Sequence, residues 1–222
     1  MDIPKLQIGT ITAEVPIVQG GMGVKVSLSS LAAAVANEGG IGTIASVGIG
    51  DIRTTREDYD GVSSEAIAEE IRKAQSATRG PIAVNVMSVL SNAETLIRTC
   101  VREGIKMIVV GAGLPLKLPA MVEDTRVNLV PIVSSGRAAT LILRTWEKRY
   151  GRTAQAVILE GPLAAGHLRF SVNEPAPAEH FPLARLLPQL LEAPQPFEDP
   201  FPVHIHVLAT GGLYTGLNIA SM

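Results

Sequence analysis

The sequence has 222 residues, a formal charge of −2 at pH 7, and 46% hydrophobic but only 4% aromatic residues. This length suits one domain, residues 1–222, with an aliphatic core, and the absence of a basic stripe argues against nucleic acid as a partner. The lone Cys100 excludes an intrachain disulfide and a cysteine metal cluster. Because no signal-peptide pattern and no apolar run of about 18 residues is present, we expect a soluble, cytoplasmic protein without membrane contact.

Short apolar segments alternate with helical patterns along most of the chain. Six segments rich in Val, Ile, Leu and Ala are predicted as strands: residues 15–19, 41–46, 81–86, 106–110, 128–133 and 156–159. A polar loop is expected at residues 47–62. Helices are predicted after it from apolar spacing of three and four: residues 63–77, 118–123 and 137–150.

Two further helices are predicted from their end signals. Ser27 or Ser29 fits the N-cap of a helix that stops at Gly39. Ser91 and Glu94 fit a capping box that opens a helix ending at Gly104.

The pattern changes after Ser171. Residues 171–202 form an irregular stretch that holds more than half of the 15 prolines. Only residues 183–192 offer helical turns there, and Pro188 is expected to interrupt them. A seventh strand is predicted at residues 203–208.

Repeated strand–helix units predict an α/β fold with a parallel sheet and right-handed crossovers. Every predicted strand is followed by small or polar residues, which therefore gather at one rim of the sheet. This arrangement is typical of a (β/α)8 TIM barrel, here incomplete with about seven strands. A doubly wound open sheet gives the same local pattern and remains the alternative.

The segment 156–170, AVILEGPLAAGHLRF, places His167 after a strand and a loop of small residues. Such a loop leaves room for a flat ligand, and glycines such as Gly166 let the backbone approach it closely. Imidazole titrates near neutrality, which suits acid–base work. From these residues alone, His167 fits a helix cap or a polar notch of the core equally well.

Five segments, taken in order, resemble the nitronate monooxygenases, formerly called 2-nitropropane dioxygenases. They are PIVQGGMG (16–23), AVNVM (83–87), PIVSSGRA (131–138), EGPLAAGHLRF (160–170) and ATGGLYTG (209–216). The resemblance implies an FMN-dependent TIM-barrel flavoprotein that oxidises alkyl nitronates with molecular oxygen, with His167 as the catalytic histidine. The related flavin-dependent enoyl-acyl-carrier-protein reductases share the glycine motif and the histidine, so an enoyl-thioester reductase is the alternative.

The same resemblance implies where a flavin is bound. The backbone at Gly20 and Gly21 would face it, with Met22 packing near the ring, although this stretch also fits an ordinary strand-to-helix turn. Asn85 would bond a flavin edge or phosphate, or simply form a turn. Ser134, like its neighbour Ser135, would bond the flavin or cap the following helix.

The phosphate of FMN is expected at the end of the seventh strand. Loops after strands seven and eight form the phosphate site of TIM barrels, and backbone amides free of side chains suit a phosphate. By resemblance, Gly211 and Gly212 would hold it, with Gly166 close to the cofactor.

Other motifs are interpreted as structural. His204 and His206 lie on one face of the predicted last strand, but no third metal ligand is evident, so no metal site is expected. Relative to the family, the sequence is expected to lack the eighth strand and C-terminal segment. A non-catalytic family member is therefore a third hypothesis, and exposed strand edges would permit a homo-oligomer.

Overall fold

The computed structural model of the chain describes residues 4–51, 53–55, 57–161, 163–164, 183–211, 213 and 215–216. The chain forms two compact units, residues 1–113 with 117–129, and residues 114–116 with 130–222. Among the described residues, no helix combines the length and the apolar character needed to cross a bilayer. The organisation of residues 1–222 as one domain stays a prediction.

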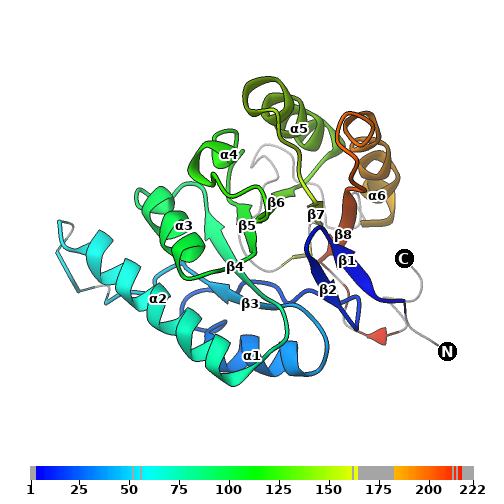
Figure 1. The fold of residues 1–222 in the computed structure, drawn as a ribbon. Coiled ribbons are helices and arrows are strands. Elements are labelled where there is room, and N and C mark those ends of the chain that lie inside the picture. The colour runs from blue at the N-terminus through cyan, green and yellow to red at the C-terminus, as the bar shows by residue number, and fades with distance from the viewer. Residues whose placement is uncertain are drawn as a thin grey trace. The chain divides into compact units, whose positions relative to one another are not determined.

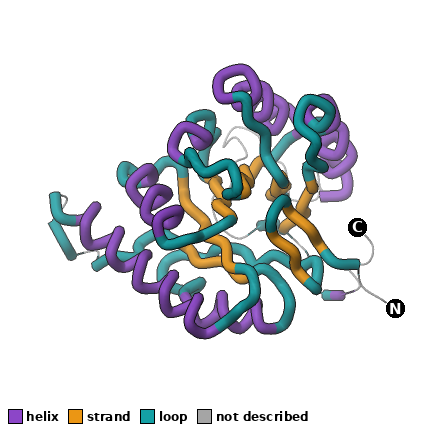
Figure 2. The backbone as a smooth tube through the Cα atoms, in the orientation of Figure 1, coloured by secondary structure: helices purple, strands orange, loops and turns teal. Residues whose placement is uncertain are grey.

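The first unit alternates strands and helices after an N-terminal hairpin (Figures 1 and 2). Its elements are β1 (Leu6–Ile8), β2 (Ile11–Ala13), α1 (Ser29–Asn37), β3 (Gly42–Ala45), α2 (Tyr59–Ala77), β4 (Ile82–Met87), α3 (Ala93–Arg102), β5 (Met107–Gly111) and α4 (Leu118–Met121). The helix α2 begins four residues earlier than the predicted helix at residues 63–77, and β3, β4 and β5 lie within one residue of the predicted strands.

Three parallel strands, β3, β4 and β5, form the core of this unit. Thr43 pairs with Ala83, and Val84 pairs with Ile108, so the strands are in chain order. Their residues are almost all buried, as expected for continuous aliphatic runs. The helices α1, α2 and α3 pack against one another in sequence order beside these strands (Figure 1).

The antiparallel hairpin β1–β2 was not predicted, because three-residue strands are too short to show a periodicity. Gly9 makes its turn with φ 52°. Ile8 and Ala13 are fully buried. Asn128 anchors the turn by accepting the Thr10 backbone N–H at 3.3 Å and donating to the Thr10 hydroxyl at 3.2 Å.

The second unit continues the same alternation. Its elements are β6 (Asn128–Val133, whose first two residues belong to the first unit), α5 (Gly136–Tyr150), β7 (Ala156–Glu160), α6 (Leu183–Glu192), the 3₁₀ helix η2 (Gln195–Phe197) and β8 (His206–Thr210). The strands β6, β7 and β8 are parallel and again follow chain order.

The helix α5 confirms its sequence signals most closely. The Ser135 hydroxyl caps it by accepting the Ala138 N–H at 3.3 Å. Gly151 ends it with φ 58°, in the left-handed region that favours glycine. Trp146 is fully buried, and its indole N–H donates to the Pro115 carbonyl at 3.0 Å.

The first predicted strand, residues 15–19, is reduced to a single parallel bridge between Val18 and Ile41. Gln19 N–H donates to Ile41 O, and Ile41 N–H donates to Ile17 O. The Ile17 N–H, which would continue this ladder, instead donates to Val15 O at 2.7 Å, so the apolar run does not become a full strand.

The predicted side-chain caps of α1 and α3 do not form. Neither helix has a side-chain hydrogen bond at its N-cap. Glu94 instead pairs with Arg98 one turn along α3, at 2.9 Å. Asn92, which precedes α3, donates to the Ser63 hydroxyl of α2 at 2.8 Å. Tertiary partners therefore replace the local caps.

Contrary to the prediction, Pro188 does not interrupt the helix α6. The helix runs through it over ten residues. A proline inside a helix removes one backbone hydrogen bond. Burial of Leu183 and Leu190 holds the two ends of α6 in place.

The last strand begins three residues later than the predicted strand at residues 203–208 and ends two residues later, at Thr210. Its pairing with β7 starts at Ala156 opposite His206. The preceding residue, Ile205, donates its backbone N–H to the Glu198 carboxylate at 2.6 Å and so belongs to the loop. Cross-strand register, rather than the apolar run, sets where the strand begins.

These features confirm the expected fold class. In the described residues, each unit holds three parallel strands in sequence order, and helices join successive strands, which is the repeat of a TIM barrel with fewer than eight strands. A doubly wound sheet would reverse its strand order, and no such reversal occurs among the described strands.

Candidate functional site

In the first unit, the glycine loop that follows Val18 packs against the carboxyl end of β4. A Cβ atom on Gly21 would lie 2.5 Å from the Cβ and 2.9 Å from the Cγ of Asn85. Only glycine therefore allows this approach. The structure brings together two predicted site residues, Gly21 and Asn85, from segments more than sixty positions apart in the sequence.

Gln19 ties the loop to the edge strand β3. Its side-chain oxygen accepts the Thr43 N–H at 3.2 Å, and its side-chain N–H₂ group donates to the Thr43 carbonyl at 3.1 Å. The same N–H₂ group donates to the Ser27 hydroxyl at 3.0 Å. The side-chain amide of Gln19 thus forms the two hydrogen bonds with the backbone of β3 that a neighbouring strand would otherwise form.

Ser27 closes the loop from the other end. Its hydroxyl donates to the Gly20 carbonyl at 3.2 Å and accepts the Met22 N–H at 3.0 Å, besides the bond from Gln19. One hydroxyl offers one donor and two acceptor sites, so Ser27 is fully used. It is also fully buried.

Sequence reasoning missed both Gln19 and Ser27. Ser27 stands just before a helix and therefore gave an N-cap signal, whereas its hydroxyl turns back to the loop. The Met22 amide is occupied by Ser27, so the Met22 side chain, 46% exposed, is the part of this residue available to a ligand.

Loops after the neighbouring strands are joined in the same way. Ser88, after β4, donates its N–H to Gly111 O at 2.8 Å and its hydroxyl to Ala112 O at 2.9 Å. Ala112 has φ 54°, which is uncommon for a residue with a Cβ. Backbone conformations of this kind cluster at ligand sites because surrounding bonds hold them.

A buried hydroxyl at this rim lacks a partner. Ser46 follows β3, is 2% exposed, and donates its backbone N–H to Asn85 O at 3.0 Å. Within the described residues, its hydroxyl oxygen makes no hydrogen bond. An unsatisfied buried polar group costs about 1–3 kcal/mol, so this hydroxyl is a ready partner for a ligand or water.

In the second unit, the ends of β7 and β8 meet. Gly161 donates its N–H to the Thr210 carbonyl at 2.9 Å. Gly211 has φ 100°, and a Cβ there would lie 2.7 Å from the Ala164 backbone nitrogen. Gly211 is therefore required both by its conformation and by its contact with the loop after β7.

Of the remaining predicted residues, only some lie in the described part of the chain. Ser134 is partly exposed between β6 and α5, and its neighbour Ser135 carries the helix cap. Gly166, His167 and Gly212 lie outside the described residues.

Other reactive side chains have structural surroundings. Burial raises the pKa of the Cys100 thiol to about 12, so it remains protonated at neutral pH inside the packing of α3. His204 is not in a strand, and its Nδ1 lies 2.9 Å from Glu198 Oε1. The part of the chain that the structure describes holds no group of three His, Cys, Asp or Glu arranged for a metal.

The model of the nitronate monooxygenase family matches residues 5–222 of this chain. A curated relative from Mycobacterium tuberculosis, (3aS,4S,5R,7aS)-5-hydroxy-7a-methyl-1-oxo-octahydro-1H-indene-4-carboxyl-CoA dehydrogenase, is 25% identical over 213 residues. That match covers 95% of this chain and 49% of the relative.

Two solved structures are similar in fold. FabK from Thermotoga maritima has a TM-score of 0.70 and 26% identity, with 94% of this chain and 54% of that protein covered. A nitroalkane oxidase from Streptomyces ansochromogenes has a TM-score of 0.69 and 22% identity, with 96% and 62% covered. The chain thus spans between about half and three-fifths of the length of these proteins.

Proposed function

Because the chain belongs to the nitronate monooxygenase family, we propose that it contributes to an FMN-dependent oxidoreductase that oxidises alkyl nitronates with molecular oxygen. The observation that carries the proposal is the glycine loop held against Asn85. There, Gly21 lets the loop pack directly against the carboxyl end of a parallel strand, which is the end where TIM-barrel enzymes bind their ligands.

The described residues fit a flavin on two counts. Gly21 and Gly211 each make a close backbone approach that a Cβ would fill. The buried Ser46 hydroxyl has no hydrogen-bond partner among the described residues. Ligand sites combine close packing with a small number of polar groups, and the first unit offers the tightly packed Gly21 loop and the unpartnered Ser46 hydroxyl.

Each contact with the cofactor that the sequence predicts stays a proposal and is given for its own unit. In the first unit, Gly20, Gly21, Met22 and Asn85 would contact its ring. In the second unit, Ser134 would contact the ribityl chain. The phosphate would be held by Gly211 and Gly212 of the second unit, and Gly166 would lie close to the cofactor.

The protein's part in the reaction is to bind and orient. When bound, the flavin supplies the redox chemistry between the nitronate and oxygen. His167 is proposed to orient the nitronate and hold a proton at a ring nitrogen, since imidazole has an ordinary pKa of about 6.5. Ser27 and Gln19 keep the glycine loop in place.

Two experiments test this proposal. The purified protein should show flavin absorption in the visible range, alone or after addition of FMN, and should consume oxygen with an alkyl nitronate. His167→Asn should lower kcat by about 10²- to 10⁴-fold without changing FMN affinity. His204→Asn, a change at an exposed histidine, should leave kcat unchanged. A colourless protein that FMN neither colours nor stabilises would contradict the proposal.

An enoyl-thioester reductase is the second candidate. It is favoured by the 26% identity to FabK and by the relative from M. tuberculosis, whose name describes a dehydrogenase of a CoA ester. Oxidation of NAD(P)H by a crotonyl thioester, without oxygen uptake on a nitronate, would select this candidate over the first.

A further inference from the structure

A pocket of about 310 Å³ lies within the second unit, between α5 and the segment formed by α6 and η2. Its volume is at the lower end of the range for small-molecule sites. No residue proposed to hold the flavin lines it. It is therefore a separate feature from the site described above.

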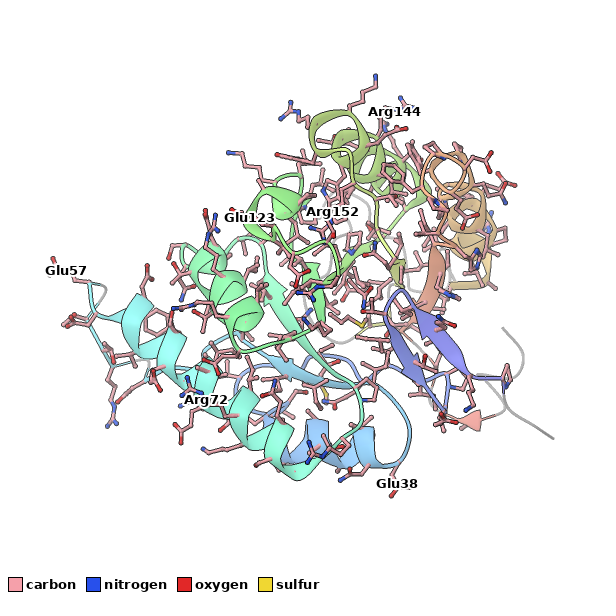
Figure 3. The ribbon with its side chains drawn as sticks, in the orientation of Figure 1. Glu38, Glu57, Arg72, Glu123, Arg144 and Arg152 are labelled. Carbon is pink, nitrogen blue, oxygen red and sulfur yellow. The ribbon has the colours of Figure 1, made fainter. Side chains whose placement is uncertain are left out.

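The α5 wall of this pocket carries three hydrogen-bond donors. Arg137, Thr140 and Arg144 are spaced three and four positions apart, so they lie on one face of the helix. The two arginine Cα atoms are about 10 Å apart along the helix axis. Arginine side chains are long enough to converge over Thr140 between them. Figure 3 shows Arg144 on α5.

Within the described part of the chain, neither arginine has a carboxylate partner. Arg72, Arg98 and Arg126 are each paired with a carboxylate at 2.6–2.9 Å. Among the described residues, no ion pair involves Arg137 or Arg144. The opposite wall holds a single acid, Glu192 of α6, which has no described ion pair either. The charge lining the pocket is therefore net positive.

The other walls make the pocket selective for more than a bare anion. A Cβ on Gly136 would lie 2.6 Å from the Gln189 carbonyl oxygen, so glycine at this position lets α6 approach the start of α5. Pro196 and the buried Phe197 of η2 add an apolar surface. Guanidinium groups are well suited to phosphate oxygens, and the apolar surface suits a carbon skeleton.

We propose that this pocket binds a small phosphate monoester, with Arg137, Thr140 and Arg144 around the phosphate and its organic group against Phe197. Glu192 opposes this binding and so limits its affinity. The positive end of the 15-residue helix α5 adds to the attraction for an anion.

Calorimetric titration of the full chain tests the proposal with phenyl phosphate, inorganic phosphate and benzyl alcohol as probes. Phenyl phosphate is expected to bind more tightly than either of the other two. Arg137→Gln and Arg144→Gln should each weaken it about tenfold or more, since a charge-assisted bond is lost. Glu192→Gln should strengthen it, because a facing negative charge is removed.

Arg149→Gln is the matched control, because Arg149 is an exposed arginine of the same helix that does not line the pocket. It should change the affinity less than twofold. Equal effects of Arg144→Gln and Arg149→Gln would overturn the proposal, as would a Glu192→Gln variant that binds no more tightly. Loss of phenyl phosphate binding in saturating FMN would also overturn it, because the probe would then be occupying the flavin site.

Discussion

Gly20 and Gly21 adjoin in the sequence but differ in their surroundings. A Cβ on Gly20 would meet nothing within 4 Å, whereas one on Gly21 would overlap Asn85. Both glycines carry the same sequence signal, so the sequence alone cannot separate them. The contact with a distant strand end makes one of the two indispensable.

We predict that Gly21→Ala displaces the loop and lowers the free energy of unfolding by about 1–3 kcal/mol, as overpacking does. The affinity for FMN should fall about tenfold or more. Gly20→Ala provides the control for stability and should leave the unfolding free energy almost unchanged, because a Cβ there meets nothing within 4 Å. Urea unfolding and flavin titration measure the two quantities, and an equal loss of stability in the two variants would contradict the assignment of Gly21 as the contact residue.

The hydroxyl of Ser27 gives a second test at this scale. Ser27→Ala leaves the Gly20 carbonyl and the Met22 amide without a partner, and should cost about 1–3 kcal/mol of unfolding free energy. Amide hydrogen exchange of residues 20–27 should become faster even without flavin. Ser76→Ala, at an exposed serine of α2 that bonds only a helix carbonyl, should have almost no effect. Unchanged amide exchange rates in Ser27→Ala would contradict the role of Ser27 in holding the glycine loop.

At the scale of helices and strands, local sequence signals determine some boundaries and tertiary contacts determine others. β6 and α5 were predictable because apolar pattern, cap and stop coincide in the sequence. The N-caps of α1 and α3 were not predictable, because the side chains of Ser27 and Asn92 form hydrogen bonds with other segments instead. The start of β8 also depended on pairing with β7, which no local pattern contains.

A bidentate ion pair joins α2 to the end of α3. Arg72 bonds both carboxylate oxygens of Glu103, at 2.8 and 2.6 Å. These hydrogen bonds lower the pKa of Glu103 below its ordinary value. A folded-state pKa below the unfolded value of about 4.3 means that the stabilisation is present at neutral pH. It is lost as the pH falls through the folded-state pKa.

We therefore predict that Glu103→Gln lowers the unfolding free energy at pH 7 by no more than about 1 kcal/mol, because Arg72 is largely exposed. The difference from the unmodified protein should vanish once the pH falls well below the lowered folded-state pKa of Glu103. Glu69→Gln, which removes an exposed pair with Lys73, is the control and should have a smaller effect. Urea unfolding over this pH range measures both, and a difference that persists in acid would contradict the prediction.

For the whole molecule, the order of strand–helix units predicted the fold class correctly. Aliphatic runs followed by small residues recur along the chain and indicate repeated strand–helix units. The intervening helices connect successive strands in parallel. The candidate site could be predicted only in part. Gly21 and Asn85 proved to be neighbours, but Gln19 and Ser27 carry no motif of their own and act through long-range hydrogen bonds.

Ligand binding gives a test at this scale. FMN at 100 times its dissociation constant should raise the unfolding free energy by about 2.7 kcal/mol. Riboflavin, which lacks the phosphate proposed to lie at Gly211, is the matched control and should stabilise less at the same concentration. Equal stabilisation by the two would contradict the phosphate assignment, and none by either would contradict flavin binding.

The three hydrogen bonds of the Ser27 hydroxyl affect the thermodynamics of ligand binding. Since Ser27 and Gln19 already fix the glycine loop, its conformational entropy is lost when the chain folds and not when a ligand arrives. A ligand that docks on Gly21 meets a prepared surface, so its association should require no slow loop rearrangement and should follow single-exponential, concentration-dependent kinetics.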